Sequence, residues 1–464
     1  MKTKKILALV LALVLVVAFF AGCGENNQNQ TPNTNNEQNQ NANNNQQQNP
    51  PAENNNQQTP PAESSGGSDE QQPPEESTGN DAIYAEHASK GTVKVGHLVD
   101  LTGVEAATGN QAKAAFDFAA ENALLIGDYE IEVIERDCQS NSGIAANMAS
   151  ELVEAGVVAI FGPTQIGHKS AVANQLADDG VPLILYNGTP AGMMRASQWV
   201  VGEGGGTMPF PTVMAHYAYE QGYRKVYTIR QDTTGGDNYV GPFEDEFVKL
   251  GGEVIDSVRL TVGGSDYTTL LTNFNDPDAD AIVGWTSSAD AINFWTSWYE
   301  LGLHEKLPVL ATMHGGFTDF YVMKQLDGKD PAIAEAIVST GTKTVINYCY
   351  SIDNAQNAEF LEIWKAGHDG AVPGGNNLAG ACWQAIEVLE RALAATNGDA
   401  EPETLLDAIF SVDFTGPEGH VFFAPGQQAA SKDVNVSQVV RLGDNYNYQV
   451  VETYNDVGVD GYTG

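Results

Sequence analysis

Positive charge is what this 464-residue sequence lacks most. It contains 22 Lys and Arg against 60 Asp and Glu, which gives a formal net charge of -38 at pH 7. Proteins that bind nucleic acid or anionic membranes by charge need clustered Lys and Arg to neutralise phosphate groups. The composition therefore excludes nucleic acid as a partner, and it excludes attachment to an anionic membrane through charge.

Cysteine is also scarce, with four residues in the whole chain. Beyond Cys23 there remain Cys138, Cys349 and Cys382, and no CxxC pair or Cys/His cluster accompanies them. The sequence therefore predicts no metal site. A Cys349–Cys382 disulfide and plain buried thiols both stay open.

Catalytic motifs are missing as well. The chain has no GxSxG, no HExxH and no P-loop. The glycine cluster at 202–206 does not lead from a strand into a phosphate-binding helix with the required spacing. We therefore predict a protein that is not an enzyme and uses no cofactor.

Only one long hydrophobic run is present, and it lies at the start. Residues 6–21 are almost entirely apolar, follow Lys2, Lys4 and Lys5, and lead into Ala21-Gly22-Cys23. This arrangement indicates an export signal over residues 1–23, and the run is shorter than the ~20 residues of a spanning helix. The cut-site residues resemble a bacterial lipobox, in which the Cys becomes the lipidated N-terminus. An uncleaved membrane anchor is the alternative.

Residues 24–82 predict a disordered tether. The segment consists mainly of Asn, Gln, Pro, Glu and Ser, with no Lys or Arg. Such a segment buries too little apolar surface to offset its ordering entropy. Its prolines disfavour the alternative of an aggregating Asn/Gln-rich segment. We expect an extracytoplasmic protein that a lipid on Cys23 anchors to the cell membrane.

Residues 83–464 have the pattern of an α/β domain. Short apolar runs alternate with helix-spaced stretches, which predicts βαβ units and a parallel sheet. The first predicted strands are Val93–Leu101, Tyr129–Asp137, Val157–Gly162 and Val181–Tyr186. The predicted helices between them are Ala107–Asn122, Gly143–Ala155 and Gly167–Asp179.

The same pattern restarts after a glycine cluster, Gly202 and Gly204–Gly206. The second array has predicted strands Lys225–Arg230, Glu253–Thr261, Ala281–Trp285 and Leu307–Thr312, and predicted helices Phe210–Gln221, Tyr239–Leu250, Tyr267–Asn275 and Ala289–Leu301. Beyond the run Ile337–Thr340, helices are predicted at Ala358–Ala366, Leu378–Ala395 and Pro402–Phe410, and strands at Phe414–Phe423, Val434–Leu442 and Tyr448–Tyr454. Two similar arrays joined by glycines predict two Rossmann-like lobes with a hinge.

The late helices and strands suggest that the chain recrosses to finish both lobes. We place lobe 1 at about 91–205 and 341–433, and lobe 2 at about 206–340 and 434–464. One continuous sheet of eight parallel strands is the alternative.

The order of these residues resembles the extracellular solute-binding proteins of branched-chain amino acid and amide ABC transporters, which have the type I periplasmic-binding fold. The resemblance covers residues 91–455. Its motifs are Leu101-Thr102-Gly103 with Gly109, Asp137, Ile160-Phe161-Gly162-Pro163, Gly180-Val181-Pro182, and Phe414-Thr415-Gly416-Pro417 with Gly419. Their order and spacing carry the resemblance.

The resemblance implies ligand-binding residues in both lobes. In lobe 1, Thr189 falls on the family's ligand Thr, and Asn187 falls on a position of backbone contact. Ile166 and Gly167 lie in a turn that is Ser-rich in the family and lacks Ser here, although its N–H groups can still bind an anion. In lobe 2, the implied residues are Tyr239, Trp285 and Ser287.

His314 stands where the family's amino-acid binders carry the Glu that holds the ligand ammonium. A neutral His neutralises an ammonium poorly, and a protonated one repels it. Asp232, Asp237 or Asp290 are candidate substitutes. Each of four residues also has a purely structural alternative. Thr189 could cap a turn or helix, Trp285 could belong to the core, Tyr239 could start its helix, and His314 could be a surface loop residue.

The resulting hypothesis is a membrane-tethered extracellular protein that delivers a small amino-acid-like or apolar carboxylate or amide solute to an ABC permease. Hinge closure around the solute is the implied mechanism. The alternative is a ligand-binding sensor subunit for a membrane receptor. An enzyme is the third hypothesis, and the missing motifs oppose it.

Removal of residues 1–82 tests the tether. We expect the truncated chain to fold and to bind its solute with unchanged affinity, because the segment has too few apolar residues to join a core. Circular dichroism and calorimetry measure both properties. Loss of folding or binding would show that this segment belongs to the domain.

Overall fold

The computed structural model describes residues 88–103, 105–189, 191–194, 196–374 and 378–464. The predicted signal peptide, Cys23 and the predicted tether lie outside these ranges. Among the described residues, no helix is long and apolar enough to cross a membrane.

The first sheet is fully parallel, with strand order β2-β1-β3-β4-β5. Its strands are β1 (Thr92–Val99), β2 (Glu130–Asp137), β3 (Ala159–Phe161), β4 (Leu183–Ile184) and β5 (Val200–Val201). The helices of this array are α3 (Ala106–Glu121), α4 (Ala123–Ile126), α5 (Ser142–Glu154), α6 (Ile166–Gln175) and α7 (Ala191–Met194). The parallel array predicted from the apolar runs is confirmed.

The second sheet is mixed, with order β11-β12-β13-β10-β9-β8-β6-β7 and β14 paired to β13. Its parallel strands are β6 (Lys225–Gln231), β7 (Glu253–Leu260), β8 (Ala281–Trp285), β9 (Val309–Ala311) and β10 (Lys343–Ile346). Its antiparallel strands are β11 (Asp413–Gly416), β12 (Gly419–Phe422), β13 (Ser431–Leu442) and β14 (Asn445–Val457). The α/β fold with two sheet-based lobes is confirmed, and the alternative of one continuous sheet is excluded.

The remaining helices follow the second array and the return of the chain. They are α8 (Pro209–Glu220), α9 (Thr234–Lys249), α10 (Thr268–Leu271), α11 (Ser288–Glu300), the 3-10 turn Leu303–Glu305, α12 (Phe320–Lys329), α13 (Pro331–Ser339), α14 (Ala355–Gly367), α15 (Leu378–Ala395) and α16 (Pro402–Ile409).

Three local predictions differ from the structure. The helix predicted over Tyr267–Asn275 is only one turn, α10. The run Ile337–Thr340 ends α13 and caps it, and the neighbouring strand begins at Lys343. The single strand predicted over Phe414–Phe423 is a hairpin that turns at Gly419, whose φ of 112° favours glycine.

Helix starts follow from polar residues that bond to the free N–H groups of the first turn. Asn141 accepts hydrogen bonds from Gly143 N and Ile144 N, and Asp319 accepts one from Val322 N. Asp330 accepts one from Ala332 N and is followed by Pro331 at the first helical position. These capping residues fix where the helices begin.

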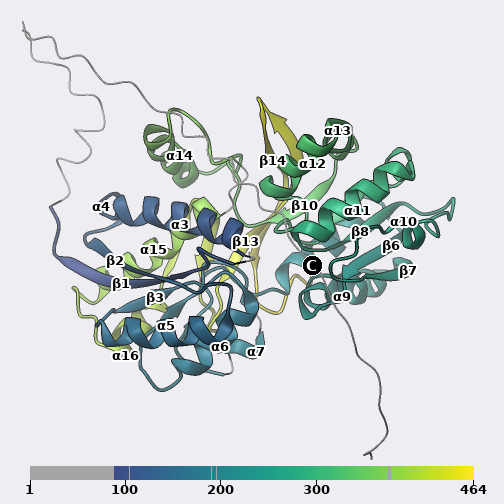
Figure 1. The fold of residues 1–464 in the computed structure, drawn as a ribbon. Coiled ribbons are helices and arrows are strands. Elements are labelled where there is room, and N and C mark those ends of the chain that lie inside the picture. Colours follow the sequence, from purple (N-terminus) through teal and green to yellow (C-terminus); the bar gives the residue numbers. More distant parts are fainter. Residues whose placement is uncertain (1–87, 104, 190, 195, 375–377) are drawn as a thin grey trace, which may run out of the picture. The chain divides into compact units, whose positions relative to one another are not determined.

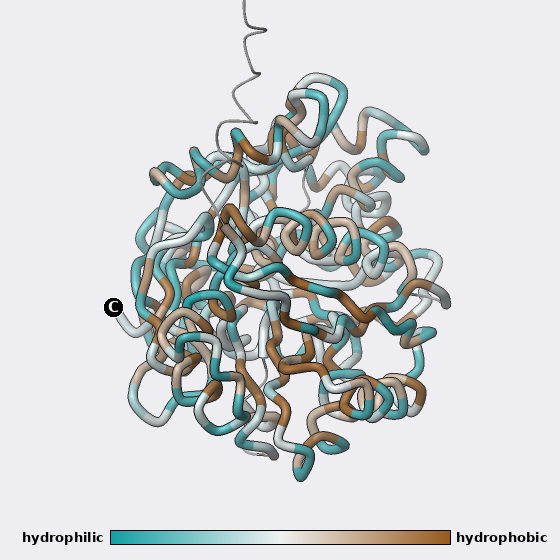
Figure 2. Tube along the Cα trace, turned by 90° about the vertical axis from the view of Figure 1, so that its left-hand side faces the viewer, coloured by the Kyte–Doolittle hydropathy of each residue, from teal (hydrophilic) through white to brown (hydrophobic). Residues whose placement is uncertain are grey.

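Each sheet is covered by helices on both faces, so each lobe has two apolar cores. In lobe 1, α3 and α15 pack on one face of the sheet and α5 and α6 on the other, as Figure 1 shows. In lobe 2, α8 and α9 pack on one face and α11, α12 and α13 on the other. The helices accordingly contain both hydrophobic (brown) and hydrophilic (teal) residues along the tube of Figure 2.

Three crossing segments connect the lobes and are bonded to one another. Gly202 N donates to Gln428 O at 2.7 Å, and Ala430 N donates to Gly202 O at 2.9 Å. Asn347 Nδ2 donates to Gly204 O at 3.3 Å. These contacts place 202–206, 347–349 and 428–435 side by side at the predicted hinge.

The glycine cluster is required by close approach as well as by backbone freedom. A Cβ on Gly204 would lie 2.4 Å from Asn187 Cα, and Gly205 has a φ of 74°. No other residue type fits both positions without a shift of the backbone. The chain beyond residue 340 first forms β10 in the second sheet, and the division into lobes at given residues remains a prediction.

A buried ion cluster joins the crossing segments. Lys432, 3% exposed, donates to Glu203 at 3.0 Å and also to Glu418, and both carboxylates are at most 1% exposed. Gln384 of α15 donates to Glu203 at 3.2 Å. Burial raises the pKa of Glu203 to about 7, and it raises the pKa of Glu418 as well. Burial acts to lower the pKa of Lys432, but the two carboxylates raise it.

Lys432→Met should destabilise the protein by ~3–5 kcal/mol, because it leaves two carboxyl groups buried without a cation. Denaturant unfolding measures this change. The triple variant Glu203→Gln, Glu418→Gln, Lys432→Met should regain most of the loss. The matched control is Lys365→Met, which breaks the exposed pair with Glu362 and should change stability by less than ~1 kcal/mol. Equal effects at both lysines would contradict a structural role for the cluster.

Candidate ligand-binding site

The strand order reverses between β1 and β3 in the first sheet and between β6 and β8 in the second. In open α/β sheets, ligands bind outside the carboxyl ends of the strands at such switch points. Thr164 follows β3, and Trp285 ends β8. The candidate site is therefore built from the loops that follow these strands.

The first turn of α6 is held by a buried ion pair. His168 Nδ1 lies 3.2 Å from Asp100 Oδ2, and Asp100 is fully buried after β1. This hydrogen bond is the main cause of the raised pKa of His168. Ile166 and Gly167 precede His168 in the same turn, and Gln165 provides no side-chain cap because its amide donates to Glu105 at 2.7 Å.

The loop after β4 lies against this turn. Asn187 Nδ2 donates to Thr164 O at 3.2 Å. Thr189 N donates to Gly205 O at 2.8 Å, which ties the loop to the first crossing segment. The Thr189 hydroxyl is fully buried and has no hydrogen-bond partner in the described part of the chain. A buried hydroxyl without a partner costs free energy, which makes the Thr189 hydroxyl a candidate for contact with a solute.

An aromatic wall comes from the second lobe. The rings of Tyr239 and Trp285 lie 5.1 Å apart, and Phe210 lies 6.5 Å from Tyr239. Trp285 Nε1 donates to Gly315 O at 2.6 Å, which fixes the indole plane. Burial raises the pKa of Tyr239 to about 12, so its hydroxyl stays neutral. Tyr239 lies in the second turn of α9 and does not start this helix.

The two halves of the site meet at Gly188. A Cβ built on Gly188 would lie 3.5 Å from Phe210 Cε2 and 3.8 Å from the Tyr239 hydroxyl oxygen. The structure thus brings Asn187 and Thr189 of lobe 1 close to Tyr239 of lobe 2. Trp285 joins them through its contact with Tyr239.

Ser287 and His314 both have partners within the protein. Ser287 Oγ accepts a hydrogen bond from Gln231 Nε2 at 2.8 Å. His314 is 3% exposed, its N donates to Val345 O, and its ring meets the edge of Tyr448 with centroids 6.0 Å apart. His314 is therefore a buried residue and not part of an exposed loop.

The acids considered as ammonium ligands all have other partners. Asp232 and Asp237 are half exposed or more and both pair with Arg259, at 3.0 and 2.6 Å. Asp290 is buried and accepts hydrogen bonds from Gln231 Nε2 at 2.6 Å and Gly263 N at 2.9 Å. All three carboxylates therefore already have a cation or N–H donor within the protein.

Lys169 bonds to the loop that carries Asn187 and Thr189, and the sequence analysis did not single it out. It lies in the first turn of α6, is 1% exposed, and donates to Asn187 O at 2.9 Å and Gly188 O at 3.0 Å. The one sequence feature that could have drawn attention to Lys169 is the rarity of Lys and Arg in this chain. A single Lys near the start of a predicted helix has no other distinguishing pattern.

The described residues contain no group of three or more His, Cys, Asp or Glu that could hold a metal ion. Cys138, Cys349 and Cys382 are buried free thiols, so the disulfide alternative is excluded.

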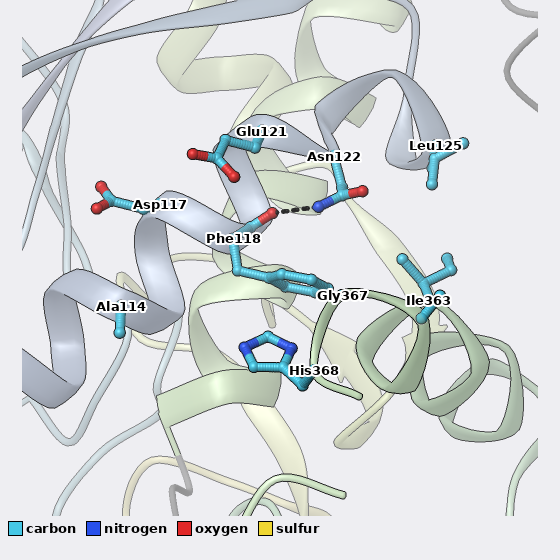
Figure 3. Close-up of a pocket in the computed structure, with 10 residues that line it drawn as sticks. Ala114, Asp117, Phe118, Glu121, Asn122, Leu125, Ile363, Gly367 and His368 are labelled. Atoms are coloured by element: carbon cyan, nitrogen blue, oxygen red, sulfur yellow. Dashed lines mark hydrogen bonds between the residues drawn. The ribbon is translucent and has the colours of Figure 1, made fainter. Parts of the chain in front are cut away.

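A cavity of about 530 Å³ lies elsewhere, between α3, α4 and α14. Figure 3 shows the His368 imidazole beside the Phe118 ring, with Asp117 and Glu121 on the same rim. Its lining comes from one lobe and includes none of the predicted ligand residues. It is therefore separate from the strand-end site.

Comparisons with known proteins point to one family. A family model described as periplasmic binding protein matches residues 92–445. The Leu/Ile/Val-binding protein homolog 6 of Brucella suis is 23% identical over 385 residues, covering 82% of this chain and 96% of the relative.

Solved structures give the same result. An ABC transporter substrate-binding protein from Sphaerobacter thermophilus is 27% identical with a TM-score of 0.69, covering 79% of this chain and 98% of its own. A solute binding protein of an ABC transporter from Rhodopseudomonas palustris, in complex with 3,4-dihydroxybenzoic acid, is 22% identical with a TM-score of 0.67, covering 79% and 98%.

Thr189→Val tests the first-lobe site. We expect solute affinity to fall by ~1–3 kcal/mol, because a ligand group loses its partner. Thermal stability should stay equal or rise, because an unpaired buried hydroxyl is removed. Calorimetry measures the affinity, and thermal unfolding measures the stability. The control is Thr342→Val, which changes a buried Thr immediately before β10. An unchanged affinity would remove Thr189 from the site.

Proposed function

The chain belongs to the periplasmic binding protein family, and from this premise we propose that it is a membrane-tethered extracellular protein that delivers a small solute to an ABC permease. The solute is amino-acid-like, or an apolar molecule with a carboxylate or amide end. The observation that carries this proposal is the meeting of the two lobes at Gly188. There the loop that carries Asn187 and Thr189 lies against an aromatic wall from the opposite lobe.

The chain is a binding protein and not an enzyme. Its family model describes periplasmic binding proteins, and its curated relatives are named as binding-protein homologues. The task of such a site is to hold a solute without changing it. Thr189 and the N–H groups at the start of α6 offer donors for the polar end. Tyr239, Trp285 and Phe210 cover the apolar part. Ile166, Gly167, Asn187, Ser287 and His314 complete the proposed set.

Closure of the two lobes follows from where these groups lie. Because donors and wall belong to different lobes, a bound solute adds contacts only in the closed form and shifts the population towards it. The crossing segments supply the hinge, since they lie side by side and are bonded to one another. A permease that recognises the closed form would then receive loaded protein.

Two kinds of solute are supported by relatives. The Brucella relative is named a Leu/Ile/Val-binding protein homolog. The Rhodopseudomonas palustris protein binds 3,4-dihydroxybenzoic acid. Both kinds have a carboxylate and an apolar body of similar size, which matches the groups around Gly188.

Mass spectrometry of small molecules that co-purify with the protein tests the proposal most directly. We expect a carboxylate or amide of amino-acid size, released by unfolding and rebound on refolding. A full screen of such solutes with no binding by calorimetry, and no co-purified molecule, would contradict the proposed function.

Membrane attachment depends on Cys23 in this proposal. Cys23→Ser should move the protein from the membrane fraction to the medium, because lipidation needs the thiol. Fractionation and immunoblotting measure this shift, with Cys138→Ser as control for a buried thiol. Retention of the Cys23→Ser protein in the membrane after signal cleavage would disprove the lipid anchor.

A further inference from the structure

Lys169 is a buried cation without an acid. It is 1% exposed, and among the described residues its ammonium donates only to two backbone carbonyls, those of Asn187 and Gly188. Within the described ranges, no carboxylate forms an ion pair with it. Burial lowers its pKa to about 7. An unpaired buried ammonium costs several kcal/mol, so the fold gains nothing from this charge by itself.

The contrast with Lys432 shows what is missing. Lys432 is equally buried, but it has Glu203 and Glu418 as counter-charges, and they raise its pKa. Lys169 has the opposite shift because no counter-charge is supplied by the chain. A ligand anion would supply it.

Other polar groups near Lys169 also have hydrogen-bonding capacity that the described residues do not use. An ammonium has three N–H donors, and the two carbonyls use two of them. The hydroxyls of Thr164 and Thr189 are buried and have no partner within the described chain. Asn187 links them, because its side chain bonds to Thr164 O and its carbonyl accepts from Lys169. The uncapped first turn of α6 adds the positive end of a helix dipole.

The opposite side of the site is apolar where it meets the loop after β4. Tyr239, Trp285 and Phe210 form an apolar wall, and Asp232, Asp237 and Asp290 already have partners in Arg259, Gln231 and Gly263 N. An α-amino acid would bring its ammonium beside the ammonium of Lys169, and like charges repel.

We propose that Lys169 neutralises the carboxylate of the solute, and that the solute is an amine-free carboxylic acid with an apolar or aromatic body. The assignment rests on the proposed solute-binding function and narrows it to one chemical class. Lys169 donates its third N–H to the carboxylate, and the Thr164 and Thr189 hydroxyls complete the polar end. The apolar body then lies against Tyr239 and Trp285.

Matched solutes test the class. Full-length protein, freed of solute by unfolding and refolding, is titrated calorimetrically with aromatic and branched aliphatic acids, with their amides, and with leucine, isoleucine and valine. We expect an acid to bind at least ~30-fold more tightly than its amide and than the amino acids, as for a buried charge pair. Tighter binding of an amide or amino acid overturns this inference and leaves solute binding intact. Binding of no member contradicts the proposed function itself.

Lys169→Met tests the residue. Affinity for the acid should fall by at least ~30-fold, while the weak affinity for the amide should hardly change. Stability should stay equal or rise, because an unpaired buried charge is removed. The matched control is Lys343→Met, a half-buried lysine at the start of β10 that bonds to Gly341 O and Gln438 Oε1. Equal losses for acid and amide would make Lys169 a support for the loop only.

The solute affinity of the wild-type protein, measured as a function of pH, gives a readout that does not depend on the folding of the Lys169→Met variant. A bound carboxylate raises the pKa of Lys169 above its value of about 7, so binding takes up a proton above that pH. Affinity should be nearly constant below pH 6 and fall by up to tenfold per pH unit above pH 7. A flat profile from pH 6 to 9 would overturn the proposal.

Neighbouring titratable groups are controlled in the same experiment. His168 lies on the same helix and is paired with Asp100, with Glu105 close by. From other elements, Tyr239 and Tyr186 have pKa values raised by burial and stay neutral in this range. A decline above pH 7 that vanishes in Lys169→Met belongs to Lys169. A decline that persists unchanged in that variant belongs to His168 and contradicts the proposal.

Discussion

The ammonium of Lys432 is the interaction on which the arrangement of this protein depends. It binds Glu203 on one crossing segment and Glu418 on the β11–β12 turn, and Gln384 extends the cluster into α15. Two carboxylates and one cation in a dry environment hold a fixed geometry, because displacing either acid leaves a buried charge without its partner. The cluster thereby fixes the crossing segment that packs, through Gly204, against Asn187. The position of the loop that carries Asn187 and Thr189 therefore depends on the crossing segment 202–206.

Lys432 and Lys169 show how one type of residue can serve two purposes. Where the chain supplies acids, a buried lysine joins segments and adds rigidity. Where the described residues supply only carbonyls, as around Lys169, we propose that an incoming anion balances the charge. The same logic applies to the hydroxyls, since Thr228 is bonded within lobe 2 to Glu244 while the Thr189 hydroxyl has no partner in the described chain.

The site was predictable in part. The family resemblance named Asn187, Thr189 and Tyr239, and the structure places Tyr239 beside Gly188, which lies between the other two; their contact with a solute stays a prediction. It could not show that Asp232 and Asp237 pair with Arg259, because that Arg lies on a separate strand, β7. It also missed Lys169, since an ammonium beneath a loop 18 residues further along the chain leaves no local pattern.

The sequence by itself determined the fold class, the two lobes and most strands, because apolar periodicity and glycine position are local properties of the chain. Strands such as β1 and β6 agree with their predicted ranges within a few residues. Only the tertiary structure decided that β11 to β14 extend the second sheet antiparallel, and that Phe414–Phe423 folds as a hairpin. It alone decided which buried charges have an oppositely charged partner among the described residues, as Lys432 has. Pairing and burial depend on contacts between residues far apart in the chain, and these exist only once the lobes are packed.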